Sequence, residues 1–388
     1  MIEYDRFIDS VENSHNITVV VDRDCTIRCT YCYLDKAEKT PYDSVAVLKS
    51  LDILLEDMNR RAIENDDDKG VILEFYPEPW VDIKRTDHLI RESLKLLLKY
   101  PALLEKYNIL LATNGYYLNK PIPIFEEILT HASLAVTVDG TKEQHDMYRL
   151  TKNGRGTWDR IVGNVKKYQD KYGIHTTKVT LGPDTIKFMF DACMYLWFDL
   201  GLTDIWMNVV FEDLWGDRLN ECVEEYDKQL KKLADYVIEN KMWEKRKHIS
   251  LLGNRNIPRR VDLTKVTAQE FTSQTFCGAA KMRSIDSDGQ VYPCIRLAKF
   301  ALGESPFVVD KNDSLDGHMR ALNLLNDYDA TPEKCMTCPL LANCAMCVGN
   351  AYDETDSIFW RTTHHCEFMK LNYKYSLIVR NAMNGIIE

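Results

Sequence analysis

The sequence has no apolar run close to the roughly 20 residues that a membrane-spanning helix needs. Met1 to Ser10 contains three acidic side chains and no apolar segment of the signal-peptide type, so we expect no secretion signal. The formal net charge of −10 speaks against the basic stripe that a nucleic-acid backbone requires. Apart from the acidic run Asp66–Asp68 there is no low-complexity segment and no internal repeat. We therefore expect a cytoplasmic protein that binds neither membranes nor nucleic acids.

Cysteine, in contrast, is abundant, with twelve residues in the chain. Without a secretion signal, this number indicates metal ligation more than disulfides. Cys193 and Cys222 fall within helix-like stretches, which is typical of buried structural thiols. The other ten form two groups, one near the N-terminus and one between Cys277 and Cys366.

The first group is Cys25, Cys29 and Cys32, with three and then two residues between them, directly after the strand-like run Ile17–Val21. Thiolates packed so closely suit an iron–sulfur cluster or zinc better than hard cations. A closed zinc site needs a fourth local ligand, and this loop offers none. A four-iron cubane with three cysteine ligands keeps one iron open. The loop therefore favours a cluster, with zinc as the alternative.

Strand-like and helix-like segments alternate after this loop. The expected strands are Ile17–Val21, Val71–Phe75, Ile109–Ala112, Leu134–Val138, Thr176–Leu181 and Asp204–Phe211, and the expected helices are Val45–Asn59, His88–Tyr100, Ile124–Thr130, Trp158–Tyr172 and Phe188–Leu200. Six such repeats predict an α/β fold with a parallel sheet and right-handed crossovers. Six is fewer than the eight of a closed barrel, so we expect an open, partial (β/α)6 barrel.

Polar residues follow several of these strands, at the edge where chemistry collects in such folds. They are Glu78 between two prolines, Asn114 in a Thr-Asn-Gly turn, Thr137 and Asp139 around the end of the fourth strand, and Glu212 with Asp213 after the sixth. Lys178 lies on the fifth strand. Each alone is also compatible with a solvated turn or surface residue.

The cysteine loop resembles the signature of the radical S-adenosylmethionine (SAM) superfamily, C-x3-C-x-aromatic-C, with Tyr31 as the aromatic residue. The resemblance implies a [4Fe-4S] cluster whose open iron binds SAM, and a 5′-deoxyadenosyl radical made from that SAM. The strand ends are similar to the family's cofactor motifs, although Tyr76-Pro77 stands where glycines are usual. The cofactor-binding residues implied are Tyr31, Glu78, Asn114, Thr137, Asp139 and Lys178. His145, in the run after the fourth strand, is expected to be structural.

The second group contains Cys277, Cys294, Cys335, Cys338, Cys344, Cys347 and Cys366, with a hairpin turn at Asp286–Gly289. A pair of zinc sites is the alternative interpretation. The spacing resembles the SPASM extension, which holds two auxiliary [4Fe-4S] clusters, although two residues rather than the usual three separate Cys344 from Cys347. The resemblance implies that Cys335, Cys338, Cys344 and Cys366 bind the outer cluster, and Cys277, Cys294 and Cys347 the inner one. His364, His365 or a substrate thiolate would complete the inner cluster.

We therefore expect a radical SAM domain over 1–215, a helical bridging segment over 216–275 and a SPASM domain over 276–388. Only some sixteen residues precede the first strand, too few for a leader-recognition module. We expect leader binding through a separate protein or through the bridging segment. The other partners expected are a precursor peptide and a reductase or flavodoxin-type electron donor.

The sequence resembles SPASM enzymes that mature cysteine-repeat peptides. This resemblance implies thioether crosslinking of a cysteine sulfur to a carbon of another residue, with Glu212 or Asp213 as proton acceptor. The alternatives are formylglycine formation of the anaerobic sulfatase-maturation type, carbon–carbon crosslinking, and a non-enzymatic electron carrier or zinc scaffold.

Overall fold

The computed structural model of the chain describes most of the expected barrel and part of the cysteine-rich region. The described residues are 14–36, 41–64, 70–104, 106–257, 282–303, 305–308, 338–340, 347–356 and 362–386. Cys277, Cys335 and Cys344 lie outside them. Among the described residues, no helix is both long enough and apolar enough to cross a bilayer.

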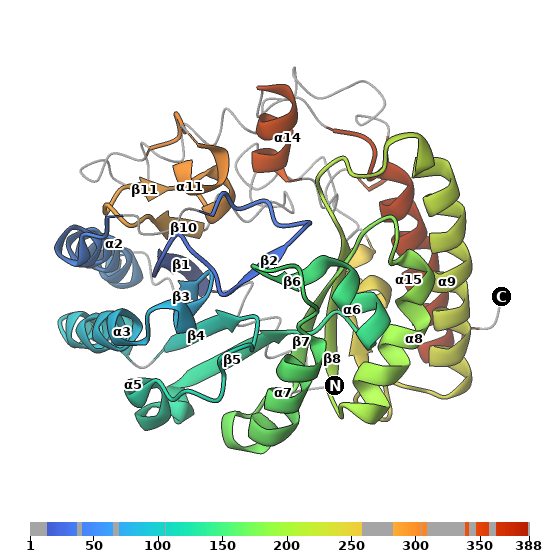
Figure 1. Cartoon of the computed structure of the whole chain (residues 1–388), viewed down its shortest axis with the longest axis horizontal. Coiled ribbons are helices and arrows are strands. Elements are labelled where there is room, and N and C mark those ends of the chain that lie inside the picture. Colours follow the sequence, from blue (N-terminus) through green and yellow to red (C-terminus); the bar gives the residue numbers. More distant parts are fainter. Residues whose placement is uncertain are drawn as a thin grey trace.

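One curved, nine-stranded sheet forms the centre of the molecule (Figure 1). Its spatial order is β11 (Val291–Tyr292), β10 (Met282–Ile285), β1 (Ser14–Val20), β3 (Gly70–Tyr76), β4 (Tyr107–Thr113), β5 (Ala132–Thr137), β7 (Thr176–Leu181), β8 (Asp204–Val209) and β9 (His248–Ile249). All neighbours are parallel except the antiparallel hairpin β10–β11. From β1 to β8 the strands follow chain order, as successive βα units require. The expected open barrel of six βα units is confirmed.

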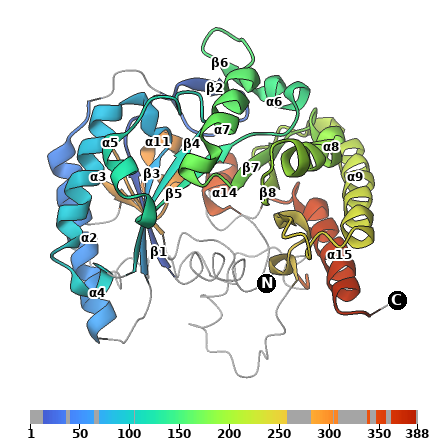
Figure 2. The ribbon, with the colours of Figure 1, turned by 90° about the horizontal axis from the view of Figure 1, so that it is seen from below.

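The described helices are α2 (Ser44–Glu64), α3 (Ile83–Leu97), α4 (Pro101–Leu104), α5 (Pro123–Glu127), α6 (Lys142–Tyr148), α7 (Trp158–Tyr172), α8 (Met189–Met194), α9 (Leu219–Glu239), α11 (Lys299–Leu302), α14 (Val348–Thr355) and α15 (Cys366–Met383). Helices α2, α3, α5, α7, α8 and α9 lie on the outer side of this arc, whereas α14 lies between its two ends, as Figures 1 and 2 show from two directions. The short 3-10 helices include η1 (Pro79–Val81), η3 (Ile186–Phe188) and η9 (Ile295–Leu297).

Alternation along the strands explains why the sheet has an apolar outer face and a polar inner face. On β3, Leu73 and Phe75 are fully buried in the core that α2 and α3 cover. Glu74 has the opposite orientation and accepts a hydrogen bond from Thr18 Oγ1 of β1 at 3.1 Å. The inner side of the barrel therefore carries charge, which a purely structural core would avoid.

Of the five expected helices, only Trp158–Tyr172 has the expected bounds. The helix expected at His88–Tyr100 begins earlier, at Ile83, because the Asp82 carboxylate caps it by accepting a hydrogen bond from the Arg85 N–H at 2.9 Å. The helix expected at Phe188–Leu200 is divided into η3, α8 and a π-helical turn, η4 (Tyr195–Asp199). Neither difference moves a strand end.

The expected hairpin around Asp286–Gly289 is confirmed as β10–β11, and it joins the barrel sheet. β10 pairs in parallel with β1, so the C-terminal part of the chain extends the N-terminal sheet edge. Gly289 has a φ of +78°, and a Cβ there would lie 2.6 Å from the backbone carbon of Ala46. Only glycine permits this close approach to α2. The three-domain division stays a prediction.

At the other end of the arc, α15 packs against α9 from the expected bridging segment (Figures 1 and 2). The Phe368 ring of α15 is fully buried between Trp215, at 4.8 Å, and Tyr226, at 5.0 Å between ring centroids. The Tyr226 hydroxyl donates to Asn372 Oδ1 at 2.7 Å. The C-terminal helix is thus fastened by aromatic packing to the end of the barrel.

Candidate active site

The loop with Cys25, Cys29 and Cys32 follows β1 at the carboxyl edge of the sheet, as expected. Its centre forms a short strand, β2 (Ile27–Cys29), which pairs antiparallel with β6 (Arg149–Thr151), so that Cys29 lies opposite Arg149. Neither β2 nor β6 is apparent from the sequence pattern, since three residues are too few for a periodic signal. This pairing fixes the cysteine loop to the segment that follows α6.

Glu78 and the Thr-Asn-Gly turn, expected to be cofactor residues, are brought together by the structure. The buried Glu78 carboxylate accepts hydrogen bonds from Thr113 Oγ1 at 2.8 Å, from the Asn114 N–H at 2.8 Å and from the Trp80 N–H at 3.2 Å. Burial nevertheless raises the pKa of Glu78 to about 7. Three donors on one buried carboxyl group fix its orientation at the end of β3.

Asn114 connects this carboxylate to the cysteine loop. Its side-chain amide donates to Thr26 Oγ1 at 2.8 Å and to Cys25 Sγ at 3.5 Å. The turn that follows requires glycine, because Gly115 has a φ of +78°. Asn114 therefore contacts one of the expected cluster ligands directly, closer than the sequence alone indicates.

Tyr31 and Asp139, also expected at the cofactor, contact each other. The Tyr31 hydroxyl donates to Asp139 Oδ2 at 2.6 Å and accepts from Arg149 Nη1 at 2.8 Å. Arg149 lies 4.0 Å from Asp139 and, like it, is almost completely buried. Burial raises the pKa of Asp139, and the neighbouring guanidinium of Arg149 opposes that rise. A buried ion pair bridged by a phenol thus lies beside Cys29, which pairs with Arg149 in the β2–β6 ladder.

His145 completes this network from behind. Its Nε2 lies 3.0 Å from Thr157 Oγ1, and its Nδ1 accepts from the Asp139 N–H at 3.2 Å. Burial, and then the charge of Arg149, lower the pKa of this imidazole well below its ordinary value, so the ring is neutral. The placement agrees with the structural role expected for His145.

Thr137 and Lys178 are neighbours in the sheet, where they pair in register between β5 and β7. The Lys178 charge lowers the pKa of both Glu74 and Asp139, in each case against the larger opposing effect of burial. Lys178 is exposed on the inner side of the barrel. It is therefore within electrostatic reach of the Asp139 network, although no hydrogen bond joins the two.

The three thiols suit a cluster by their surroundings as well as by their spacing. Burial raises the pKa of Cys25 to about 12, with a further rise from the Glu78 charge, and burial also raises the pKa of Cys29. Coordination to a metal cation is what stabilises thiolates buried in this way. Within the described residues no three His, Cys, Asp or Glu side chains converge on a single ion. A cubane, in contrast, binds each cysteine to a different iron.

Glu212 and Asp213, the expected proton acceptors, are placed differently from each other. Glu212 forms an ion pair with Arg296, which comes from the C-terminal half and is 8% exposed. Asp213 is exposed, and its Oδ1 accepts from the Gly216 N–H at 3.4 Å. The two carboxylates therefore do not act as a matched pair.

Cys294, Cys338, Cys347 and Cys366 are the described members of the second cysteine group. The two histidines proposed as additional ligands contact backbone carbonyl oxygens instead: His364 Nε2 lies 2.9 Å from Phe211 O, and His365 Nε2 lies 2.9 Å from Val210 O. Burial lowers the pKa of His365 to about 4. In this arrangement only their Nδ1 atoms remain for a metal. The division of the cysteines between two clusters stays a prediction.

Two arginines that the sequence analysis did not assign to the site are central to it. Neither Arg149 nor Arg296 stands at the end of an expected strand, where the site residues were expected. The signal for Arg296 was available, since it is a single cation in the apolar run Ile295–Ala298, two residues after a cysteine. A charge in such a run is retained when it has buried partners.

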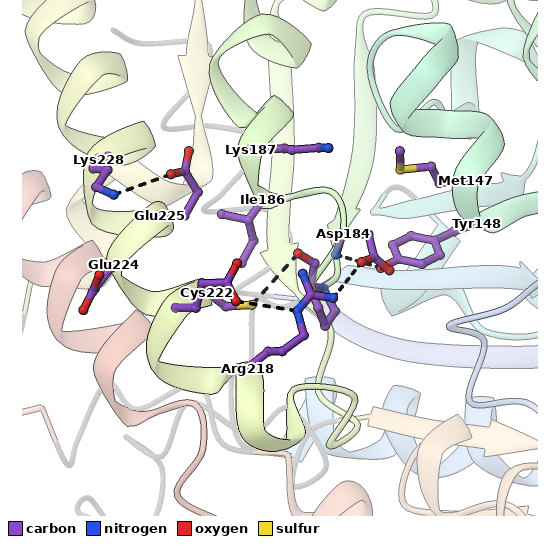
Figure 3. A pocket seen from close by; sticks show the side chains of 12 residues that line it. Met147, Tyr148, Asp184, Ile186, Lys187, Arg218, Cys222, Glu224, Glu225 and Lys228 are labelled. Atoms are coloured by element: carbon purple, nitrogen blue, oxygen red, sulfur yellow. Dashed lines mark hydrogen bonds and ion pairs between the residues drawn. The ribbon is translucent and has the colours of Figure 1, made fainter.

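A cavity of about 680 Å³ opens beside this site, between α9, the end of α6 and the loop after β7 (Figure 3). Tyr148 joins the two, since its carbonyl accepts from the Thr30 N–H at 3.0 Å and its hydroxyl donates to Asp184 at 3.1 Å. Figure 3 shows Arg218 directed toward Asp184, whereas no contact is drawn for Lys187 or Glu224. The cavity therefore offers charges of both signs near the cysteine loop.

No family model matches the chain. Among curated proteins it is similar to the cysteine-type anaerobic sulfatase-maturating enzyme of Clostridium novyi (strain NT), with 31% identity over 158 residues. That alignment spans 39% of this chain and 40% of the relative, less than half the length of either.

Solved structures match over far more of the chain. The structure of anSMEcpe with bound AdoMet and Cp18Cys peptide is 17% identical, with a TM-score of 0.67, and the match covers 96% of this chain and 100% of that one. SuiB from Streptococcus suis, bound to precursor peptide SuiA, is 16% identical, with a TM-score of 0.55 and coverage of 92% and 78%. At such identities the likeness concerns the fold alone. The chain therefore shares the fold of these two proteins over most of its length.

Proposed function

We propose that this chain is a radical SAM enzyme that modifies a peptide or protein substrate. The observation that carries the proposal is the cysteine loop itself, held at the carboxyl edge of an open barrel by Asn114 and by the pairing of β2 with β6. The three cysteines would hold the catalytic [4Fe-4S] cluster. When bound, the cluster and SAM would supply a 5′-deoxyadenosyl radical that removes a hydrogen atom from the substrate.

The side chains around the loop fit SAM as a ligand. Arg149 Nε is buried and has no hydrogen-bond partner among the described residues, so this guanidinium has a donor left for the SAM carboxylate. Glu78 would face the amine of the methionine moiety from the end of β3. Tyr31, Asn114, Thr137, Asp139 and Lys178 would surround the rest of the molecule. The chain's own contribution is orientation, because these groups already hold one another in place.

Two reactions have support. Formylglycine formation is supported by the similarity to the anaerobic sulfatase-maturating enzyme. Thioether crosslinking is supported by the resemblance of the cysteine-rich segment to peptide maturases. Both reactions start from a cysteine-containing peptide. In either case we expect two auxiliary clusters bound by the second cysteine group, and a reductase or flavodoxin-type protein as electron donor.

We also propose that the cavity in Figure 3 binds a segment of the substrate peptide, which is the role that the sequence suggested for the bridging segment. The residues that line it include Lys187 and Glu224, for which no ion pair is found in the described structure, and the apolar side chains of Ile186 and Met147. Such a surface suits a peptide with both apolar and charged side chains.

The experiment is anaerobic reconstitution with iron and sulfide, followed by incubation with SAM, a reductant and a cysteine-containing peptide. We expect 5′-deoxyadenosine and a modified peptide. Formylglycine made from cysteine loses the sulfur, whereas a thioether loses two hydrogens, keeps the sulfur and consumes a free thiol. Binding of zinc in place of iron and sulfide, with no 5′-deoxyadenosine, would contradict the proposal.

The cavity is tested separately with Lys187→Glu and Glu224→Lys. Each should raise the KM for the peptide several-fold and leave SAM cleavage without peptide unchanged, because neither residue contacts the cysteine loop. Lys245→Glu, an exposed residue beyond α9, is the matched control. An unchanged KM in both variants would exclude the cavity as the peptide site.

A further inference from the structure

Arg296 contacts three segments that meet at the mouth of the barrel. Its guanidinium carbon lies 4.1 Å from the centre of the Tyr33 ring, and its Nη2 donates to Asn350 Oδ1 at 2.7 Å. Its ion pair with Glu212 reaches the segment after β8. One side chain thus joins the catalytic loop, the end of the last barrel strand and α14.

Each of these contacts is close in sequence to an expected metal ligand. Tyr33 follows Cys32, Arg296 is two residues after Cys294, and Asn350 is three residues after Cys347. Cys32, Tyr33 and Ile295, the residue after Cys294, all pack against the same small hydrophobic cluster. Tyr33 and Arg296 therefore lie between the catalytic cysteine loop and the thiols expected to bind the inner auxiliary cluster.

The packing around Arg296 leaves no space for a larger neighbour. A Cβ on Gly349 would lie 2.4 Å from Arg296 Cγ, so the start of α14 approaches the arginine side chain as closely as a glycine permits. Asn350 is held in turn by Glu354, to which its Nδ2 donates at 3.0 Å. Displacing Arg296 would therefore displace Cys347 at the beginning of α14.

Two opposite charges, the Arg296 guanidinium and the Glu212 carboxylate, meet at this position. A guanidinium keeps its positive charge at any ordinary pH. The Arg296 side chain packs against Gly349, two residues after Cys347, on one side, and its cation is paired with the Glu212 carboxylate on the other. A cation near a cluster favours the reduced state, and a carboxylate opposes this effect.

We propose that Arg296 is a positioning residue that holds the thiols of Cys294 and Cys347 against the catalytic loop, and that its charge, balanced by Glu212, sets the reduction potential of the cluster bound there. The inference rests on the proposed function and assigns Glu212 a role different from that of proton acceptor. Because the carboxylate is engaged by a buried guanidinium, it acts on the site through Arg296.

The test uses the full chain with Cys25, Cys29 and Cys32 replaced by alanine, so that only clusters bound by the second cysteine group give a signal. The potential is measured by reductive titration with dithionite, followed by electron paramagnetic resonance. Arg296→Gln should lower the potential and Glu212→Gln should raise it. Arg91→Gln, which removes an exposed arginine paired with Glu127 on the far side of the barrel, should leave it unchanged.

Arg296→Lys separates charge from position. It keeps the cation but loses the planar contact with Tyr33 and the directed hydrogen bond to Asn350, so we expect a potential close to wild type and faster loss of iron to a chelator. A merely structural role predicts shifts of the same sign, or none, in Arg296→Gln and Glu212→Gln, and either result would overturn the inference. The proposed function is judged independently, by the iron content and SAM cleavage of the wild-type protein.

Discussion

Cys29 lies in a strand whose backbone is paired with β6, whereas Cys294 and Cys347 precede two short helices, η9 and α14, which are joined by the side chains of Arg296 and Asn350. The connection of β2 to β6 depends on main-chain hydrogen bonds that most residues can make. The connection of η9 to α14 depends on one guanidinium and its partners. Under the proposed function, the loop that would hold the catalytic cluster thus has the support that is less sensitive to side-chain replacement.

The largest expected effect separates the two cysteine groups by function. Cys29→Ser should abolish SAM cleavage, because the catalytic cluster loses a ligand. Cys347→Ser should preserve SAM cleavage and abolish the modified peptide. The readouts are 5′-deoxyadenosine by chromatography and peptide mass. Cys193→Ala, at a buried thiol outside both groups and outside the cavity of Figure 3, is the control. If Cys347→Ser also abolished SAM cleavage, the two sites would not be independent.

The next effect concerns the free energy of unfolding, to which the packing of α15 against α9 contributes. Phe368→Ala removes the ring between Trp215 and Tyr226 and should lower the free energy of unfolding by about 3–5 kcal/mol. Ile378→Ala, at an exposed position of the same helix, should change it by less than about 0.5 kcal/mol. Urea denaturation of the metal-free protein measures both. Equal losses would mean that α15 is not held by this ring.

A somewhat smaller loss in the free energy of unfolding is expected at the buried ion pair of Asp139 and Arg149, beside the cysteine loop. Asp139→Asn leaves Arg149 buried without its counter-ion and should cost about 3 kcal/mol of stability in the same urea assay. Asp159→Asn breaks the exposed pair with Lys142 and should cost less than about 1 kcal/mol. A cost for Asp139→Asn no larger than that of the control would show that the backbone pairing of β2 with β6 supports the loop alone.

The smallest expected effect is on the pH dependence of stability, and it arises at Glu126 of α5, outside both cysteine groups. Hydrogen bonds from Lys171, and then from Tyr172 at 2.7 Å, lower the pKa of Glu126. A carboxyl group whose pKa is lower in the folded state adds stability above its unfolded pKa, and this stability is lost as the pH falls through the folded pKa. Because the pair is largely exposed, the contribution should be below about 1 kcal/mol. Glu126→Gln should reduce, by that amount, the loss of unfolding free energy that is measured by urea denaturation as the pH is lowered. An unchanged loss at low pH would show that Glu126 does not contribute.

The strands could be predicted because each is a run of alternating or continuous apolar residues, and their order follows from the handedness of βα crossovers. Glu78, Asn114 and Asp139 could be selected because they follow such strands, and parallel strands bring their carboxyl ends to one edge. The pattern did not reveal that Tyr31 bonds to Asp139, or that Asn114 contacts Cys25. Those contacts join residues 108 and 89 positions apart in the chain.

The sequence by itself determined the open barrel of six βα units, the position of the cysteine loop after its first strand and the edge at which the polar residues gather. These depend on periodicity and spacing, which are local properties of the chain. Only the tertiary structure decided the partners of the polar groups in the site: Tyr31 and Asp139 for Arg149, Tyr33 and Glu212 for Arg296, and backbone carbonyls for His364 and His365. A buried polar or charged group must pair with a group that packing brings within hydrogen-bond distance, and such groups come from segments far apart in the sequence.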